Sequence, residues 1–287
     1  FLTIPILGRW NQALAAVTTV GAVPNAPPAG GGAVVGAFII GESAFGSVTV
    51  TGGTAITSNG GAMIGNNLAG VGVVSLSGFG SNWTIGGLNS DLTLGDEGVG
   101  SLSITNSAVM LVPDDTIIGA QSTSSGRLTI SGLGSVFTNT DDVTIGNAGL
   151  GVVEIFNGGG MTSDVAVFGD ATTGRGLATI SGLNSRWTAT LTNIGDAGQA
   201  RLEVLAGGRY IAAGDTNVGI LSGSVGVIDV SGAGSLYSAG GPNFILGNVG
   251  TGEIVVRDGG LMTSASTITL AAPAAEIGKR VHGPTAE

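Results

Sequence analysis

The feature that most constrains this chain is an internal repeat, in which an apolar residue followed by glycine returns every 23 to 30 residues. Repeating units of this size form solenoids, because each unit buries its apolar face against its neighbours. The repeat therefore predicts stacked coils. Its copies are Ile40-Gly41, Ile64-Gly65, Leu94-Gly95, Ile118-Gly119, Ile145-Gly146, Phe168-Gly169, Ile194-Gly195, Val218-Gly219 and Leu246-Gly247, with Leu270-Ala271 as a degenerate last copy.

Two turn motifs alternate along the repeat and give the length of its unit. One reads Ser-Gly-x-Gly/Asn-Ser-x-aromatic and recurs about every 50 residues, and the other is a turn of small residues midway between its copies. The structural unit is therefore about 25 residues long. The first motif spans 77–83, 131–137, 181–187 and 231–237, and the second spans 106–108, 157–159, 206–208 and 258–260.

Within each unit, apolar residues alternate with polar ones, as at Leu102/Ile104 and Ile228/Val230. Alternation with a period of two predicts strands that are buried on one side. A unit of this length holds three short strands and three turns, and glycine suits the turns because it adopts a positive φ without strain. We predict an all-β fold, a right-handed single-stranded parallel β-helix of about ten coils with an N-terminal cap.

The β-helix is expected to cover residues 33–271, and both ends of the chain lie outside the repeat. Residues 1–32 are predicted to form a strand/helix cap and a Pro/Gly linker, with Trp10, Leu14 and Val17 on one helical face. Residues 272–287 are predicted to be a tail or a partial C-terminal cap. Caps are expected because a solenoid ends in unpaired strand edges that otherwise invite aggregation.

The first residues of the chain, Phe1 to Leu7, alternate, with Leu2, Ile4 and Ile6 on one face, and Phe1, Leu2, Ile4 and Ile6 are the candidate strand residues. This pattern predicts a strand, and the role of that strand has two interpretations. The strand caps the first coil of its own chain, which we favour, or it pairs with the open end of another copy. The second interpretation makes it an assembly strand.

Composition and charge exclude several classes of protein. With 55 Gly, only 8 Pro and 43% hydrophobic residues, the chain is neither disordered nor collagen-like. A net charge of −10 argues against nucleic-acid binding. The absence of Cys excludes disulfides and thiolate chemistry. Since no run of 18 apolar residues occurs, we expect no membrane insertion.

Counting back from the glycine of each coil reveals a column of aspartates. Asp114 and Asp115 in one coil, and Asp141 and Asp142 in the next, are predicted to form one patch of four carboxylates. Carboxylates this close raise each other's pKa or recruit a cation such as calcium, and paired aspartates also cleave polysaccharides in some β-helix enzymes. We favour a solvated corner over a cation site, and a cation site over catalysis. The column also holds Asp91, Asp164 and Asp215.

An aromatic residue ends the first turn motif in every second coil. If exposed, this column would be a ladder for sugar rings, and if buried it would pack the wider coils, which is the interpretation we favour. The column consists of Trp83, Phe137, Trp187 and Tyr237, with Met110, Met161, Tyr210 and Met262 as predicted counterparts in the other coils.

Residues for nucleophilic catalysis are hard to assemble from this sequence. The only histidine, His282, lies in the tail, and no serine has the context of a nucleophile elbow. We therefore expect no catalytic residues, no enzyme activity and no cofactor, apart from the candidate calcium site.

The alternation of Ser-Gly-x-Gly-Ser-x-Trp and Asn-Gly-Gly turns over roughly residues 35–270 resembles the β-strand repeats of autotransporter passengers and related exported bacterial proteins. The resemblance implies a secreted β-helix at the bacterial surface, and it does not imply a catalytic site. We expect a structural subunit of a surface layer, sheath or filament that assembles with itself through its ends. The alternatives are an adhesin or autotransporter passenger, and a β-helix that binds or cleaves a cell-surface polysaccharide.

Overall fold

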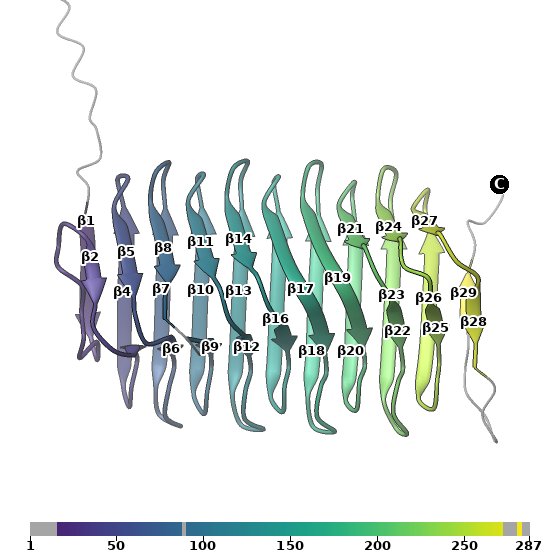
Figure 1. The fold of residues 1–287 in the computed structure, drawn as a ribbon, viewed down its shortest axis with the longest axis horizontal. Coiled ribbons are helices and arrows are strands. Elements are labelled where there is room, and N and C mark those ends of the chain that lie inside the picture. The colour runs from purple at the N-terminus through teal and green to yellow at the C-terminus, as the bar shows by residue number, and fades with distance from the viewer. Residues whose placement is uncertain (1–15, 88–89, 272–279, 283–287) are drawn as a thin grey trace, which may run out of the picture.

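The computed structural model of the chain describes residues 16–87, 90–271 and the backbone of 280–282. Within these ranges the protein contains 29 strands and no helix. The strands stack coil upon coil into a rod whose long axis runs across Figure 1. The predicted parallel β-helix is therefore confirmed.

One side of the rod is an 11-stranded sheet, sheet A, to which each coil contributes one strand. Its strands pair in parallel except for β1 and β4, and the register keeps equivalent residues such as Leu102, Leu128 and Val153 in one column. The strands are β1 (Ala16–Gly21), β4 (Phe45–Thr51), β7 (Val71–Ser77), β10 (Val99–Thr105), β13 (Ser125–Ser131), β16 (Leu150–Phe156), β18 (Arg175–Ser181), β20 (Gln199–Leu205), β23 (Val225–Ser231), β26 (Thr251–Arg257) and β29 (Arg280–His282).

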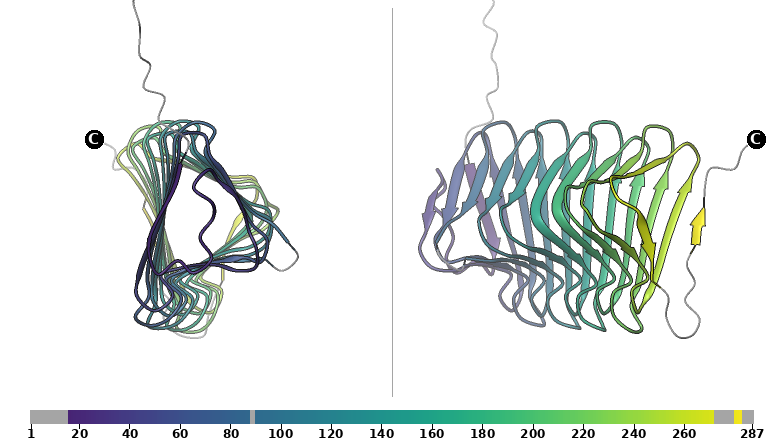
Figure 2. Two further views of the ribbon diagram at one scale, coloured as in Figure 1. Left: turned by 90° about the vertical axis from the view of Figure 1, so that its left-hand side faces the viewer. Right: turned by 45° about the vertical axis from the view of Figure 1, so that its right-hand side comes forward.

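The other two sides of the triangular coil, seen end-on in Figure 2, belong to the 18-stranded sheet B. Each complete coil gives one strand to either side, and in two coils these strands merge into β17 and β19. The strands are β2 (Gly32–Val34), β3 (Phe38–Ile40), β5 (Ala55–Ser58), β6 (Ala62–Ile64), β8 (Asn82–Ile85), β9 (Leu92–Leu94), β11 (Val109–Val112), β12 (Thr116–Ile118), β14 (Val136–Asn139), β15 (Val143–Ile145), β17 (Gly160–Phe168), β19 (Arg186–Ile194), β21 (Arg209–Ala212), β22 (Thr216–Val218), β24 (Leu236–Ala239), β25 (Phe244–Leu246), β27 (Leu261–Ser264) and β28 (Ile268–Leu270).

The described residues form nine complete coils, from β4 to β28, one fewer than a count of ten but in agreement with the prediction of about ten. The difference lies in the first copy of the repeat, Ile40-Gly41. Its strand β3 follows β2 in an incomplete coil, because the strand before them, β1, runs antiparallel to β4 instead of joining the parallel stack. Each apolar-Gly pair ends a coil, so counting these pairs added the incomplete coil to the total.

The core is a stack of apolar layers that fills the inside of the coils. The glycine of each apolar-Gly pair lies at a corner of the coil, and the apolar residue directly before it is fully buried in every coil from Ile40 to Leu246. Each of these residues is covered by its equivalents about 4.8 Å above and below. Full burial of such a side chain contributes about 1.5–3 kcal/mol. Stability is therefore distributed along the rod rather than concentrated in one place.

The corner glycines are required by both backbone conformation and space. Gly146 has a φ of 70°, and a Cβ at this position would lie 2.2 Å from the carbonyl oxygen of Arg175 in the next coil. A side chain here would therefore be strained and would also collide with backbone. This double constraint explains why the apolar-Gly pair is the most regular element of the repeat.

The Ser-Gly-x-Gly-Ser motif links neighbouring coils through its second serine. The Ser185 hydroxyl donates a hydrogen bond to the Ser181 carbonyl (2.7 Å) and accepts one from the Gly158 N–H of the preceding coil (3.0 Å). One side chain thus satisfies backbone groups of two turns that strand pairing leaves free. Equivalent bonds to the preceding coil join Ser81 to Gly53, Ser135 to Ser107 and Ser235 to Gly207.

The N-terminal end of the rod is covered by its own chain. Strand β1 lies antiparallel on the edge of β4, and the segment between β1 and β2 crosses the mouth of the first coil in Figure 2. Pro27 is buried there, and the Gly41 N–H donates to the Ala22 carbonyl. The predicted helical face is wrong at Val17, which lies in β1. Trp10, Leu14 and the predicted strand of Phe1, Leu2, Ile4 and Ile6 lie outside the described residues.

The C-terminal end of the rod is covered less completely by the described residues. Leu270 is 53% exposed, whereas Leu246, its equivalent one coil earlier, is fully buried. Met262 and Ile268 are likewise only partly buried, although they continue core columns. Strand β29 pairs in parallel with β26 and so extends sheet A beyond the last complete coil. It leaves β27 and β28 without a further described neighbour.

Candidate functional site

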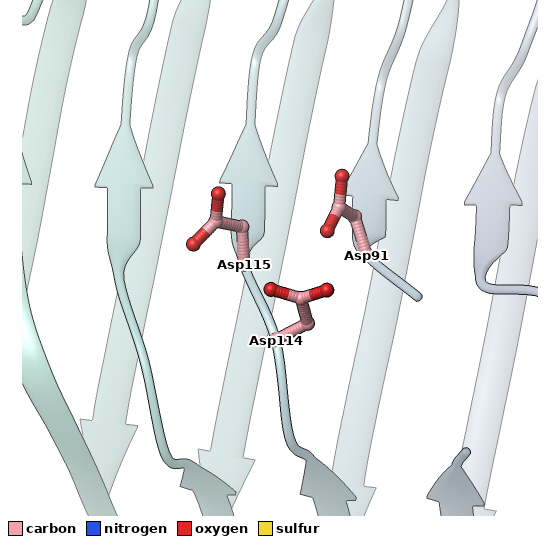
Figure 3. A group of neighbouring side chains, drawn as sticks. All are labelled: Asp91, Asp114 and Asp115. Carbon is pink, nitrogen blue, oxygen red and sulfur yellow. The ribbon is translucent and has the colours of Figure 1, made fainter. Parts of the chain in front are cut away.

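The predicted aspartates gather at the corner where the two sides of sheet B meet. Asp91 directly precedes β9, and Asp114 and Asp115 directly precede β12 in the next coil. Figure 3 shows these three side chains on adjacent coils, and one carboxylate oxygen of each lies within 4.8 Å of the others. The parallel register creates this group, because it repeats the same corner in every coil.

A second group of three carboxylates shares a member with the first. Asp115, Asp141 and Asp142 also bring oxygens within 4.8 Å of one another. The four aspartates predicted from the sequence are therefore neighbours, but they form two overlapping triads rather than one patch. Asp91 completes the first triad, and its place in the column already indicated that it would lie nearby.

Asn139 organises this corner, and sequence reasoning missed it. Its amide donates to the Asp114 carbonyl (2.6 Å), and its Oδ1 accepts from the backbone N–H of Asp141 (2.8 Å). The Asp114 carboxylate accepts a further bond from the backbone N–H of Ser90 (2.9 Å). Asn139 is almost fully buried, and its polar side chain at an inward-facing position was the signal available in the sequence.

Three carboxylates of this corner have a pKa above that of an isolated aspartate. Burial raises the pKa of Asp91, Asp115 and Asp142 above the ordinary 3.8, and neighbouring carboxylates raise it further. A bound cation would relieve this repulsion. Calcium, however, prefers six to eight oxygen ligands, whereas each triad supplies three carboxylate side chains. The calcium site stays a prediction.

The aromatic column faces the core, as predicted. Trp83, Phe137, Trp187 and Tyr237 are fully buried, so they offer no ladder for sugar rings. Their polar atoms find partners inside the core: for example, the Trp187 Nε1–H donates to the Ser163 hydroxyl at 3.1 Å. Strand pairing places the predicted counterparts Met110, Met161, Tyr210 and Met262 in the same column.

Three hollows on the described surface lie away from the aspartates. Two are on the outer face of sheet A around Leu177 and Arg201, and the third is at a corner beside Arg186 and Arg209. Enzymes that cleave polysaccharides hold two carboxylates on either side of the bond to be cleaved. Because Asp114 and its neighbours line none of these three hollows, the hollows give no support to catalysis at the acidic corner.

The pair Arg186 and Arg209 was also missed at the sequence level. Each arginine directly precedes a residue of the aromatic column, in Arg186-Trp187 and Arg209-Tyr210. Equal positions in consecutive coils stack in register, so the spacing contained the signal.

Comparison with family models, with curated proteins and with solved structures finds no match to this chain. The resemblance to autotransporter passengers therefore stays a prediction. Among the described residues, no helix is long and apolar enough to cross a membrane.

Proposed function

We propose that this chain is a structural β-solenoid, the subunit of a bacterial extracellular layer, sheath or filament that assembles through its ends. The observation that carries the proposal is the contrast between the covered N-terminal coil and the exposed core columns at the C-terminal coil. The proposed extracellular location rests on the repeat pattern that resembles exported bacterial proteins.

The last complete coil offers both kinds of surface that end-to-end contact needs. Apolar residues of the core columns are accessible there: Leu270 is 53% exposed, and Met262 and Ile268 are only partly buried. In the described residues, β27 and β28 pair only with the preceding coil, so their outer edges present free N–H and C=O groups. Adding a strand from another copy would satisfy these groups and cover Leu270.

The proposed partner is the N-terminal region of a second copy. Its alternating segment with Leu2, Ile4 and Ile6 has the period-two pattern of a strand with one apolar face. A contact between the C-terminal end of one copy and the N-terminal region of the next is heterologous. Repetition of such a contact without ring closure produces filaments.

The proposal includes no catalysis, because the acidic corner is better explained as a solvated charge cluster. We expect the quadruple variant D114N/D115N/D141N/D142N to keep its fold and its assembly. Purified protein would be compared with this variant for release of reducing ends from acidic and neutral polysaccharides. A polysaccharide-cleaving activity that the variant loses would overturn the non-catalytic proposal.

Assembly is tested by deleting residues 1–9 and, separately, by L270D, with L183D as the matched control. Leu183 is 76% exposed on a corner of the rod, so L183D adds the same charge away from the ends. We expect filaments from the parent chain and L183D, and monomers from L270D and the deletion, by light scattering and negative-stain microscopy. A parent chain that is monomeric at every concentration would overturn end-to-end assembly.

A further inference from the structure

Two arginines lie side by side on the flank of the rod. Arg186 on β19 and Arg209 on β21 are register partners in neighbouring coils, and both side chains are exposed. Together with Leu133, Gly158 and Asn184 they line a hollow at the corner between sheet A and sheet B. The two guanidinium groups thus project from strands about 4.8 Å apart at one small site.

Neither arginine has an acidic partner among the described residues. All the ion pairs there are formed by Arg127, Arg201 and Arg257, and neither Arg186 nor Arg209 donates a side-chain hydrogen bond. Like charges directly opposite each other in a sheet are destabilising. The chain has only 9 Lys and Arg against 19 Asp and Glu, yet places two of them together without a carboxylate. Each guanidinium keeps five N–H donors for an external acceptor.

The hollow is open because neighbouring glycines carry no side chains. Its rim combines apolar and polar groups. Gly160 is the register partner of Arg186, and a Cβ added to it would meet nothing closer than 4.0 Å. Leu133 is 66% exposed and lies over Gly158. The exposed Asn184 supplies an amide that donates and accepts.

We propose that this hollow binds a carboxylate-bearing sugar unit of an acidic polysaccharide. The planar guanidinium groups match a carboxylate through paired, charge-assisted hydrogen bonds. Leu133 offers contact to the apolar face of the sugar ring, and the Asn184 amide offers hydrogen bonds to its hydroxyls. A uronic acid carries a carboxylate, hydroxyls and an apolar ring face on one rigid ring, and this is the combination that the arginines, Asn184 and Leu133 are arranged to contact.

The experiment titrates the full chain with a galacturonic acid hexamer, by calorimetry and by NMR shifts. The variant is R186Q/R209Q, and the control R127Q/R175Q removes the same two charges from sheet A. We expect about tenfold or greater loss of affinity in R186Q/R209Q, a smaller loss in each single variant, and an unchanged affinity in the control. Added salt should weaken the binding, because both arginines are exposed.

Several outcomes would overturn the proposal. These are no binding of the acidic hexamer, equal binding of a neutral glucose hexamer, equal competition by sulfate at the same ionic strength, or equal loss in R127Q/R175Q. Dissociation of assembled copies by R186Q/R209Q, without loss of a sugar signal, would assign the site to a protein partner instead. Repeating the titration on the chain lacking residues 1–9 separates this site from end-to-end assembly, because either can fail alone.

Discussion

The two ends of the rod are built from the same repeat but differ in how completely their core residues are covered. At the N-terminal end, Phe38 and Ile40 of the incomplete first coil are fully buried beneath a segment of the same chain. At the C-terminal end, the equivalent residues Ile268 and Leu270 are partly buried and exposed. The sequence of a coil therefore does not determine its burial. The burial of its core residues is determined by whether a further layer of chain covers the coil.

This difference teaches how the rod obtains its stability. A residue such as Leu246 is buried by the coil above it as much as by its own coil, so stability arises from the contacts between neighbours. Among the residues that the structure describes, an interior coil has two neighbours, and the last complete coil has one in full and only β29 of another. Substitutions at equivalent positions should therefore have large effects inside the rod and small effects at its open end.

The largest effect is expected from removing the N-terminal cover. Deleting residues 1–31 takes away β1 and exposes Phe38 and Ile40, which should lower the free energy of unfolding by about 5 kcal/mol and promote aggregation. Deleting only residues 1–15 is the control, because β1 remains. Denaturant unfolding and light scattering measure both effects. An equal loss of stability in the two deletions would show that β1 is not the cover.

Substitution of a corner glycine should have the next largest effect. G146A forces a side chain into a positive φ and against the backbone of the next coil, and should cost about 4 kcal/mol. The counterpart at the open end is already alanine, since Ala271 stands at the corner position of the last coil without a positive φ. A271G should therefore change stability by less than about 1 kcal/mol. Chemical unfolding compares the two, and a mild effect of G146A would contradict the close approach of the coils.

Truncation of one core column separates interior from end directly. L246A should lower the free energy of unfolding by about 3 kcal/mol, because it leaves a cavity between two coils. L270A removes the same atoms from a half-exposed position and should cost about 1 kcal/mol or less. Similar losses for the two variants, measured on dilute monomer, would mean that the last coil is covered as fully as the others.

The smallest effect is expected at two equivalent aspartates with different neighbours. Asp115 is crowded by carboxylates, whereas Asp215 accepts bonds from the backbone N–H and the amide of Asn243. At neutral pH, D115N should stabilise the protein by about 0.5 kcal/mol, and D215N should destabilise it by a similar amount. Thermal unfolding compares the two, and the same sign for both would contradict this comparison.

The pH dependence follows from the raised pKa of Asp115. The folded state binds the proton more tightly than the unfolded state, so this group should make the protein more stable as the pH falls toward 4, through a pKa above 3.8. D115N should flatten this part of the stability curve. An unchanged pH profile would mean that neither burial nor the neighbouring carboxylates raise the pKa of Asp115.

The repeat allowed the fold to be predicted, because its period and alternation leave few structures other than stacked coils. The local spacing of residues was misleading at the N-terminal end. It placed Val17 on one helical face with Trp10 and Leu14, and that prediction is wrong at Val17. The strand that forms there contains Val17, Thr18, Thr19 and Val20, and β-branched residues in succession favour a strand over a helix. Local composition was the better guide at that position.

The candidate sites were predicted only where the repeat itself placed residues together. The Asp column followed from counting along the coils, and the structure brings its members within reach of one another. The hollow beside Arg186 and Arg209 depends on Gly158 and Gly160 leaving space between coils, and on Leu133 closing one side. The shape of this hollow arises because glycines lack side chains. The columns found in the sequence follow residues that carry side chains, so they did not indicate the hollow.

The coil-to-coil hydrogen bonds, including those of Ser185 and its equivalents, point along the long axis of the rod. A pulling force on the two ends would therefore load the coil boundaries in series, and the weakest boundary would yield first. The last complete coil, with the least cover, is the expected starting point, and each coil that peels away would release about 25 residues. In a single-molecule pulling experiment, extension should thus rise in steps of about 85 Å of contour length. A filament of such rods would lengthen under load by shedding coils and shorten again as they rewind.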